Sequence, residues 1–394
     1  MARPDKPYRV YKGGRTIGRV PLRSRPDSRA RDRRDGNGEA PGTSRPKRSR
    51  RRWGWGRRIG VAFLVVLLVV LVWGVLSFLS FRGGVAKANK RVGFATRAAL
   101  NRQDSLLLSS PTDVLLLGTD HSNSDARAND QHSDSIMLMR TDPSHHRIAY
   151  LSIPRDLRAD IPGHGAAKIN AAFQIGGPAL AIRTIRNFTS LPINHVVTVD
   201  FASFQQLIDE VGGITVDVPA PILSNRFDCP FATAARCQRW PGWRFAKGPQ
   251  HMDGHRALIY SRIRENRLNP AESDVTRAER QQHVVQALIR KLSSFSTLVN
   301  APLDAGKFLR PIATDLSAWQ LMQLGWVYKR AGRVLHCRLG GSASSVGGES
   351  VIVSTQENRA VVQMVTGHSA PQPPPPGSGP YGPGCVVGNR PIGK

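Results

Sequence analysis

The sequence predicts an α/β domain, a central mixed β-sheet flanked by helices, behind one N-terminal transmembrane helix. From residue 113 onward, short apolar and β-branched runs alternate with segments of helical periodicity. This alternation is typical of a sheet covered by helices. One uncharged apolar segment, residues 59–81, precedes these runs. The hydrophobic content of 40% suffices for a core and excludes a chain that is disordered throughout.

The first 58 residues have the composition of a disordered basic tail. They hold 20 Lys and Arg against 5 Asp and Glu, and so contribute +15 of the formal net charge of +28. Segments with few apolar residues and high charge do not bury enough surface to fold. Such a tail fits either phosphate neutralisation on a nucleic acid or a cytoplasmic flank beside a membrane span.

Residues 59–81 favour the membrane interpretation. A helix of this length spans roughly 34 Å, which is enough to cross the hydrocarbon of a bilayer. Arg57 and Arg58 directly precede it, and the positive-inside rule then places the tail in the cytoplasm and the rest of the chain outside. We therefore expect a single-pass protein of the cell membrane that binds no specific nucleic acid. A cleaved signal peptide is the alternative, but the apolar run is longer than such peptides have.

The segments after the span are assigned in chain order, beginning with a helical stalk or linker at 82–112. Buried strands are expected where short apolar runs are bounded by glycine or polar residues, namely at 114–117, 135–139, 148–153, 195–199 and 214–218. Helical periodicity predicts helices at 178–188, 201–211, 253–259 and 274–292. The last helix is expected to be capped by Ser273 or Asp274. A long loop is expected at 220–250, and the whole core domain spans 113–296.

The C-terminal part of the chain divides into an extension and a tail. Residues 297–366 are predicted to add an amphipathic helix near 315–331, a strand around Cys337, and a further strand and helix. Residues 367–394 are rich in proline and glycine, which predicts an extended or disordered tail apart from Cys385.

All four cysteines follow the membrane span. An even number in an oxidising compartment predicts two disulfides. A Cys229–Cys237 bond would close a short loop and leave Cys337–Cys385 to attach the tail. Four cysteines allow three pairings, and their spacing leaves the connectivity open.

Several basic side chains lie beside predicted strand ends and helix starts, namely Arg155, Arg262, Arg264, Arg277 and Arg280. Guanidinium groups bind phosphate oxygens in bidentate fashion. Asp120 and Asp134 lie next to loops at the ends of two predicted strands, and two carboxylates with room for water and phosphate oxygens suit Mg²⁺. Each residue alone is more often a surface ion pair or a turn. Together they point to a metal-bound pyrophosphate.

The chain resembles the LytR–CpsA–Psr family of membrane-anchored cell-wall glycopolymer transferases. The resemblance rests on collinear motifs at 113–120 (DVLLLGTD), 133–138 (SDSIML), 151–156 (LSIPRD), 168–173 (KINAAF), 260–264 (YSRIR) and 274–282 (DVTRAERQQ). The ordered set covers about residues 113–292. His132 is a departure, because the family often has arginine before the Ser-Asp of the second motif.

The resemblance implies an apolar tunnel for a polyprenyl lipid and a site for its pyrophosphate. Asp120 and Asp134 would hold Mg²⁺ and act in catalysis with Arg155. The residues expected to bind the pyrophosphate oxygens are Arg155, Arg262, Arg264, Arg277 and Gln281. The implied reaction moves a glycopolymer from polyprenyl pyrophosphate to a hydroxyl of peptidoglycan and releases polyprenyl phosphate. A polyprenyl-pyrophosphate pyrophosphatase and a non-enzymatic envelope regulator or scaffold are the alternatives.

Overall fold

The computed structural model describes residues 54–103, 105–120, 132–270, 274–292, 309–310, 312–379 and 381–388. The chain separates into two units, residues 1–58 and 59–394. Only residues 54–58 of the first unit are described, so the rest of the basic tail lies outside the description. Ser273, the other candidate cap of the helix at 274–292, also lies outside it. The fold is that of the second unit.

Helix α1 (Trp55–Lys90) contains the apolar segment and continues beyond it. Within the described part of the chain, α1 is the one helix that is long and apolar enough to cross a membrane. Its apolar side chains are exposed as far as Leu79, whereas Val85 and Ala88 near its C-terminal end are buried. The last turns of α1 therefore belong to the folded domain, and the expected stalk begins as a continuation of the same helix.

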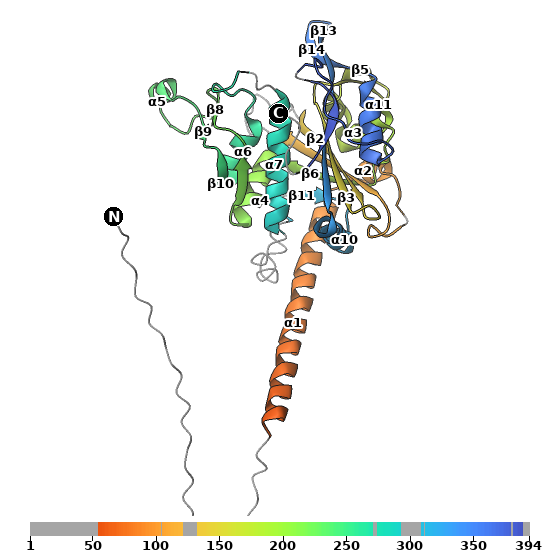
Figure 1. Ribbon diagram of the computed structural model, residues 1–394, viewed down its shortest axis with the longest axis vertical. Helices are drawn as coiled ribbons and strands as arrows, with labels where there is room; N and C mark the ends of the chain where they lie inside the picture. The colour runs from red at the N-terminus through yellow and green to blue at the C-terminus, as the bar shows by residue number, and fades with distance from the viewer. Residues whose placement is uncertain are drawn as a thin grey trace, which may run out of the picture. The chain divides into compact units, whose positions relative to one another are not determined.

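The centre of the domain is a seven-stranded mixed sheet in the order β11-β6-β1-β2-β3-β12-β15 (Figure 1). Its strands are β1 (Thr112–Asp120), β2 (His132–Asp142), β3 (Arg147–Ile153), β6 (His195–Asp200), β11 (Ile312–Thr314), β12 (Arg333–Arg338) and β15 (Gly384–Val387). β1, β3, β6 and β12 run parallel to one another, and β2 is antiparallel to its neighbours β1 and β3. The carboxyl ends of four strands and the amino end of β2 therefore meet at one edge, which we call the carboxyl edge.

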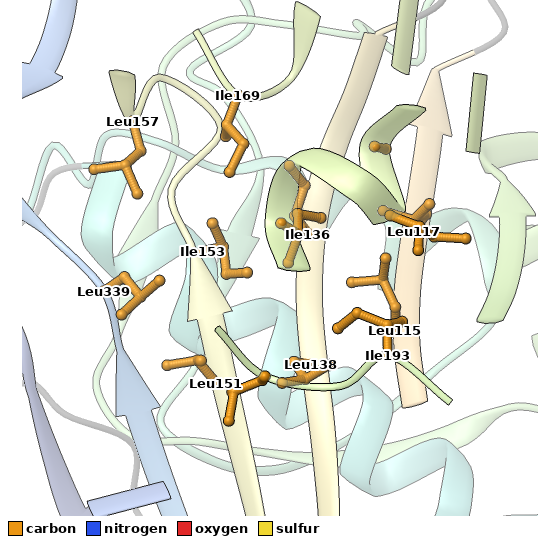
Figure 2. Packing of buried hydrophobic residues seen from close by; sticks show 14 of the residues in the cluster. Leu115, Leu117, Ile136, Leu138, Leu151, Ile153, Leu157, Ile169, Ile193 and Leu339 are labelled. Carbon is orange, nitrogen blue, oxygen red and sulfur yellow. The ribbon is translucent and has the colours of Figure 1, made fainter. Parts of the chain in front are cut away.

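Helices cover both faces of this sheet. On one face, α2 (Phe94–Ala99), α3 (Ala171–Thr189) and α11 (Glu357–Thr366) pack against alternate strand residues such as Leu115, Leu117, Ile136, Leu138 and Leu151 (Figure 2). On the other face, α10 (Ala318–Arg330) packs through Leu324 on Val114, and α7 (Asp274–Leu292) hydrogen-bonds to β2 and β12. Alternation along each strand fixes which side chains reach which layer.

Helix α3 is longer than the helix predicted at 178–188, because it begins at Ala171 and contains a kink. Gly176 and Gly177 have non-helical backbone angles, with a φ of 59° at Gly177, and Pro178 follows. Proline is tolerated there because it stands in the first turn after the break. A hairpin that the periodicity did not reveal, β4 (Arg158–Ile161) and β5 (Gly165–Lys168), precedes the helix.

A second apolar cluster lies beside the main sheet. It joins α7 to α4 (Phe201–Glu210), α6 (Gly254–Arg262), β7 (Ile214–Val218) and β10 (Gly248–Met252). The loop predicted at 220–250 is only partly a loop. It also contains the short elements β8 (Ile222–Leu223), α5 (Ala234–Arg239) and β9 (Arg244–Phe245). The prediction was wrong at its end, since β10 pairs with β7 over five residues despite its glycine and proline.

Two disulfides join Cys229 to Cys237 and Cys337 to Cys385, the pairs that the short-loop argument favours. Cys337 and Cys385 are direct partners in the antiparallel pairing of β12 and β15. The expectation of a tail extended or disordered apart from Cys385 was wrong for residues 384–387, because they form β15 at the edge of the main sheet. β13 (Gly341–Val346) and β14 (Glu349–Ser354) form a hairpin between β12 and α11.

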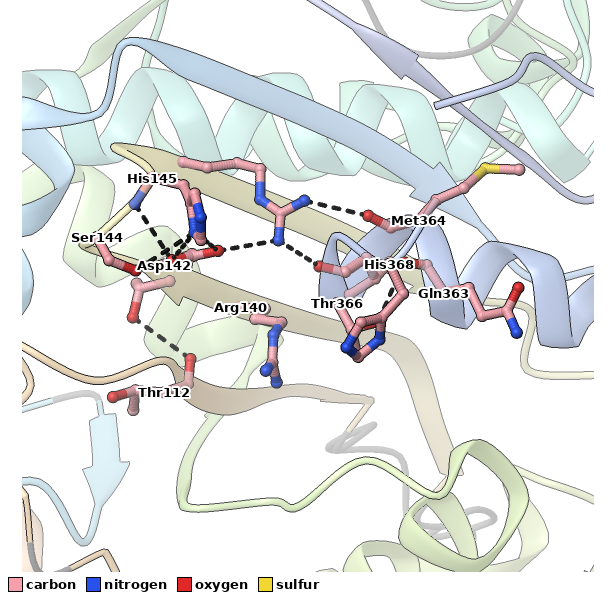
Figure 3. A network of polar contacts seen from close by, with 12 residues as sticks. Thr112, Arg140, Asp142, Ser144, His145, Gln363, Met364, Thr366 and His368 are labelled. Atoms are coloured by element: carbon pink, nitrogen blue, oxygen red, sulfur yellow. Dashed lines mark hydrogen bonds and ion pairs between the residues drawn. The ribbon is translucent and has the colours of Figure 1, made fainter. Parts of the chain in front are cut away.

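A polar network ties α11 to the end of the sheet opposite the carboxyl edge (Figure 3). Arg147, at the start of β3, donates to Asp142 at 3.1 Å and to the carbonyls of Met364 and Val365 at 3.3 and 3.2 Å. Asp142 also accepts a hydrogen bond from Ser144 at 2.8 Å. These bonds hold the β2–β3 hairpin against the last turn of α11 and leave the carboxyl edge free of this network.

Candidate active site

The carboxyl edge brings Asp120 and Asp134 to the same end of adjacent strands. Asp120 is the last residue of β1 and pairs with His132. The register then shifts, so that Gly118 pairs with Ser135 and Thr119 with Ser133, which makes Asp134 the extra residue of a β-bulge. Bulges re-aim side chains and are frequent beside active sites. The side chains at 120 and 132–134 lie outside the description, so their placement here is that of the backbone.

Helix α7 contacts β2 next to this bulge. The Ser135 hydroxyl donates to Gln281 Oε1 at 2.8 Å. Arg277 precedes Gln281 by four residues, so the two occupy the same face of α7. Arg277 and Arg280 are 7% and 3% exposed, which is rare for arginine. The helix therefore brings the predicted pyrophosphate ligands Arg277 and Gln281 to the β1–β2 end of the carboxyl edge.

Arg155 follows β3 at the same edge. Ile153 pairs with Ile136 of β2, so Arg155 lies two residues further on, at the level of the Asp134 bulge. Its Nε is 3.5 Å from Asp156 Oδ2, and Lys168 Nζ is 3.6 Å from the other oxygen of that carboxylate. Asp156 is therefore within ion-pair distance of both Arg155 and Lys168.

Arg262 and Arg264 lie on either side of a buried residue. α6 ends at Arg262, and Ile263 is extended and fully buried, so its two neighbours point away from the core. Arg262 donates to Asp228, which directly precedes the disulfide loop closed by Cys229 and Cys237, and its guanidinium lies 5.3 Å from the Phe201 ring. Phe201 directly follows β6, which places Arg262 near the carboxyl edge. Arg264 is exposed.

Arg338 is a candidate site residue that the sequence analysis missed. It ends β12, pairs with Ser152 of β3, and is 7% exposed. Its Nε and Nη2 donate to the Gly382 carbonyl at 3.2 and 2.7 Å. Burial lowers the pKa of Arg338, while Glu279 of α7 raises it. The strand alternation that puts His336 and Arg338 on one face was the available signal.

Asp200 adds a third carboxylate to the carboxyl edge, since it pairs with Thr119 of β1. Its oxygens accept hydrogen bonds from the Ser203 amide at 2.8 Å and the Ser203 hydroxyl at 2.7 Å. This is the geometry of a helix N-cap, and Asp200 opens α4. Its role is therefore structural.

The donor chemistry of Asp120 and Asp134 fits Mg²⁺. Within the described side chains, no group of three or more His, Cys, Asp or Glu could hold a metal. Mg²⁺ is usually bound by one or two carboxylates together with water and substrate phosphates. Two aspartates on adjacent strands, with arginines beside them, match that pattern.

Comparison with known proteins identifies the family of this arrangement. The LytR_cpsA_psr family model matches residues 79–366. This chain belongs to the LytR–CpsA–Psr family. The match begins at the end of the apolar segment of α1 and extends through the last residue of α11, so the C-terminal extension is included with the sheet.

Two curated relatives of this LytR–CpsA–Psr protein are named polyisoprenyl-teichoic acid–peptidoglycan teichoic acid transferases. TagV of Bacillus subtilis is 30% identical over 275 residues, which cover 69% of this chain and 67% of TagV. TagU of Enterococcus faecalis is 28% identical over 289 residues, which cover 73% of this chain and 89% of TagU. These relatives support the family assignment over most of the chain.

Solved structures confirm the fold class. The crystal structure of B. subtilis TagV matches with a TM-score of 0.51 and 28% identity, covering 66% of this chain and 97% of that one. TagT bound to LIIa-WTA matches with a TM-score of 0.52 and 24% identity, covering 68% and 95%. The central mixed sheet with flanking helices is therefore the family fold.

Proposed function

We propose that this protein is an extracytoplasmic phosphotransferase that moves a glycopolymer from a polyprenyl-pyrophosphate carrier to a hydroxyl of peptidoglycan. The observation that supports it most directly is the hydrogen bond between Ser135 and Gln281. This bond joins the Asp134 bulge to the helix face that bears Arg277. A carboxylate pair and an arginine face at one edge suit a metal-bound pyrophosphate. The transferase names of the relatives agree with this reaction class.

The reaction follows from the chemistry of a pyrophosphate diester. An acceptor hydroxyl attacks the phosphorus that bears the glycan. A new P–O bond forms, the bridging P–O–P bond breaks, polyprenyl phosphate leaves, and the hydroxyl proton is released. Phosphoryl transfer relies mainly on positioning and electrostatic stabilisation, so the protein needs fixed positive charge more than a nucleophile of its own.

Each proposed residue has a distinct part in this reaction. Arg155, beside Asp156, and Arg277, on α7, bind non-bridging oxygens and neutralise the charge that develops on them. Gln281 fixes α7 to β2 through Ser135. Asp120 and Asp134 would hold Mg²⁺, which supplies Lewis-acid stabilisation of the phosphate oxygens when bound. Arg262 and Arg264 extend the positive charge toward α4 and the disulfide loop.

The membrane topology is part of the same proposal. α1 is apolar enough to span a bilayer, and the basic residues precede it, so the tail lies in the cytoplasm and the domain outside. Both disulfides then lie in the oxidising compartment, where such bonds persist.

The test uses the full-length protein in detergent with a short-chain polyprenyl-pyrophosphate glycan, a peptidoglycan oligomer and Mg²⁺. Mass spectrometry should detect a phosphodiester-linked conjugate. Asp134→Asn should lower its rate by about 100-fold or more, because the metal and the charge it supplies are lost. The matched control is Asp160→Asn, an exposed aspartate on β4, which should retain the wild-type rate.

The products separate this proposal from its alternatives. Glycan phosphate released at equal rates with and without the acceptor would indicate a pyrophosphatase. Tight retention of the donor with no Mg²⁺-dependent turnover would indicate a binding protein or scaffold. Either result would refute the transferase.

A further inference from the structure

Helix α10 presents a stripe of large apolar side chains to solvent. Trp319, Met322 and Trp326 are 57%, 46% and 55% exposed. They stand at spacings of three and four residues, so they share one face of the helix. Ala318, Leu324 and Val327, which lie outside this face, are buried. We call the three exposed side chains the α10 stripe.

A turn that packs against α10 also exposes apolar side chains. Leu106 and Leu108 are 58% and 40% exposed, whereas Leu107 between them is buried and packs with Leu324 of α10. The Leu107 amide also donates to Gln323 Oε1 of α10 at 2.9 Å. Scattered exposed apolar residues are ordinary on soluble proteins, but three large apolar side chains on one helix face, with two exposed leucines on a turn that packs against the same helix, indicate an interaction surface.

The α10 stripe belongs to the helix that receives the end of the apolar segment of α1. Val85 of α1 is buried with Ala318 of α10, and Phe81 and Leu321 pack against the same cluster. Phe81 is the last residue of the apolar segment. Val85 follows it by about 6 Å along the helix. Figure 1 shows α10 beside the end of α1 that enters the domain. A bilayer spanned by α1 would therefore end about one helical turn from α10.

The charges around the stripe suit an anionic lipid surface. The sequence of α10 contains no acidic residue and ends in Lys329 and Arg330. The Arg330 guanidinium lies 5.0 Å from the Trp326 ring. Lys87 and Lys90 add positive charge to the last turn of α1. Tryptophan with neighbouring Lys and Arg is the composition found at the headgroup level of membrane proteins, where each basic side chain is attracted to anionic lipid.

We propose that α10 is an interfacial helix whose stripe inserts into the outer leaflet of an anionic bilayer and docks the domain on the membrane. The proposal rests on the membrane topology given under the proposed function and goes beyond it, because α1 alone would tether the domain without fixing its orientation. With the stripe inserted, the domain has two attachments to the bilayer and one defined face toward it.

The test places one spin label at a time on the full-length protein in nanodiscs that contain anionic phosphatidylglycerol. All four native cysteines are in disulfides, so an introduced cysteine is the one free thiol. Met322→Cys reports on the stripe. Val346→Cys, on the β13–β14 hairpin and 41% exposed, is the matched control, and Val66→Cys reports on α1.

At each position, the collision rate of the spin label with oxygen, which concentrates in lipid, is compared with its collision rate with a water-soluble nickel chelate. The ratio of oxygen to nickel accessibility should be several-fold higher at 322 than at 346. Equal ratios would overturn the proposal, and so would a label at 322 shielded from both reagents, because protein would then cover the stripe. A label at 66 that fails to report lipid would refute the proposed topology as well. If only the label at 322 fails, this inference alone is wrong.

A label-free measurement guards against perturbation by the substitution. Brominated phosphatidylglycerol should quench the tryptophan fluorescence of the wild type more than that of the double variant Trp319→Gln with Trp326→Gln. The same fractional quenching in both proteins would overturn the proposal. Both substitutions replace exposed side chains, so the thermal unfolding midpoint of the double variant should stay within a few degrees of the wild-type value.

Discussion

Protonation of the buried His336 should destabilise the protein in mild acid. His336 is fully buried on β12. Its Nδ1 lies 2.9 Å from Gln282 Oε1 and its Nε2 lies 3.2 Å from Gln286 Nε2. These contacts fit the neutral ring, with Nδ1 donating and Nε2 accepting. A second proton on Nε2 would face another donor. The imidazolium would also lose its hydration, so acid should break the contact between β12 and α7.

The pKa values give the size of the effect. Burial lowers the pKa of His336 from 6.5 to about 4. The unfolded chain therefore takes up its proton first as the pH falls. The stabilisation is complete above pH 6.5 and is lost between 6.5 and 4. At about 1.4 kcal/mol per pKa unit, the loss is about 3 kcal/mol at pH 4 and about 2.5 kcal/mol at pH 4.5.

The assay is urea unfolding of the full-length protein in detergent, at pH 7.5 and pH 4.5. His336→Gln can keep hydrogen bonds to α7 but does not titrate, so it should lose about 2.5 kcal/mol less than the wild type between the two pH values. The control is His368→Gln, an exposed histidine after α11 that should follow the wild type. Burial and the nearby His336 lower the pKa of His283 to about 4. His283 therefore leaves some pH dependence of the unfolding free energy in both the wild type and His336→Gln. If the free energy of unfolding fell by the same amount in His336→Gln and in the wild type between pH 7.5 and pH 4.5, the reasoning would be refuted.

Four further variants test packing by the same urea measurement. Replacing Cys337 and Cys385 by alanine removes a link across 48 residues and should lower the free energy of unfolding by about 4 kcal/mol on the loop-entropy model; no change would mean that β15 is held by its ladder alone. Gly254→Ala would place a Cβ 2.1 Å from a backbone oxygen of α4 and should cost about 1–3 kcal/mol. Gly325→Ala, with no atom within 4 Å, should instead stabilise α10 by about 0.8 kcal/mol, and equal effects of the two alanines would contradict the close approach. Arg338→Met removes two hydrogen bonds from a charged donor and should cost about 2 kcal/mol; a neutral result would mean that Arg338 does not hold the turn before β15.

The parts of the fold that sequence patterns predict are those with a strong local signal. The helix at 274–292 coincides with α7 because its periodicity is long and uninterrupted. The strands at 114–117 and 135–139 coincide with the centres of β1 and β2, because apolar runs of that length can only be buried. The predicted strands were shorter than β1 and β2, because hydrogen-bonded pairing with neighbouring strands extends a strand beyond its apolar run.

β15 and β10 show where local reasoning fails. Residues 384–387 follow a run of proline and glycine, so composition argued for an extended tail, yet β12 provides a partner 48 residues away in sequence. β10 contains Gly248 and Pro249 and becomes a strand because β7 pairs with it. Long-range pairing outweighs local propensity in both cases.

The candidate site was predictable in its residue types and less so in its spatial relations. Arg155, Arg277 and Gln281 were proposed from motifs, and the fold places all three at the carboxyl edge. Arg262 and Arg264 were also proposed from a motif, but no sequence pattern could reveal that Asp228, just before Cys229, would bind Arg262. Strand alternation could have singled out Arg338, but the neighbours that make it significant, β3 and Glu279 of α7, are brought to it only by folding.

The direction of the parallel strands has a consequence for the lipid-linked donor of the proposed reaction. β1 advances from the end of the sheet covered by α10 to the carboxyl edge, and its nine residues span about 30 Å, close to the hydrocarbon thickness of a bilayer. In the proposed reaction and membrane orientation, phosphates at the carboxyl edge stand well above the headgroups, so the first isoprene units of the proposed carrier would have to leave the membrane. Each exposed methylene would cost about 0.8 kcal/mol. The proposed transfer would therefore need a dry path along the sheet, and lipid extraction and return would then limit its rate as much as bond breaking does.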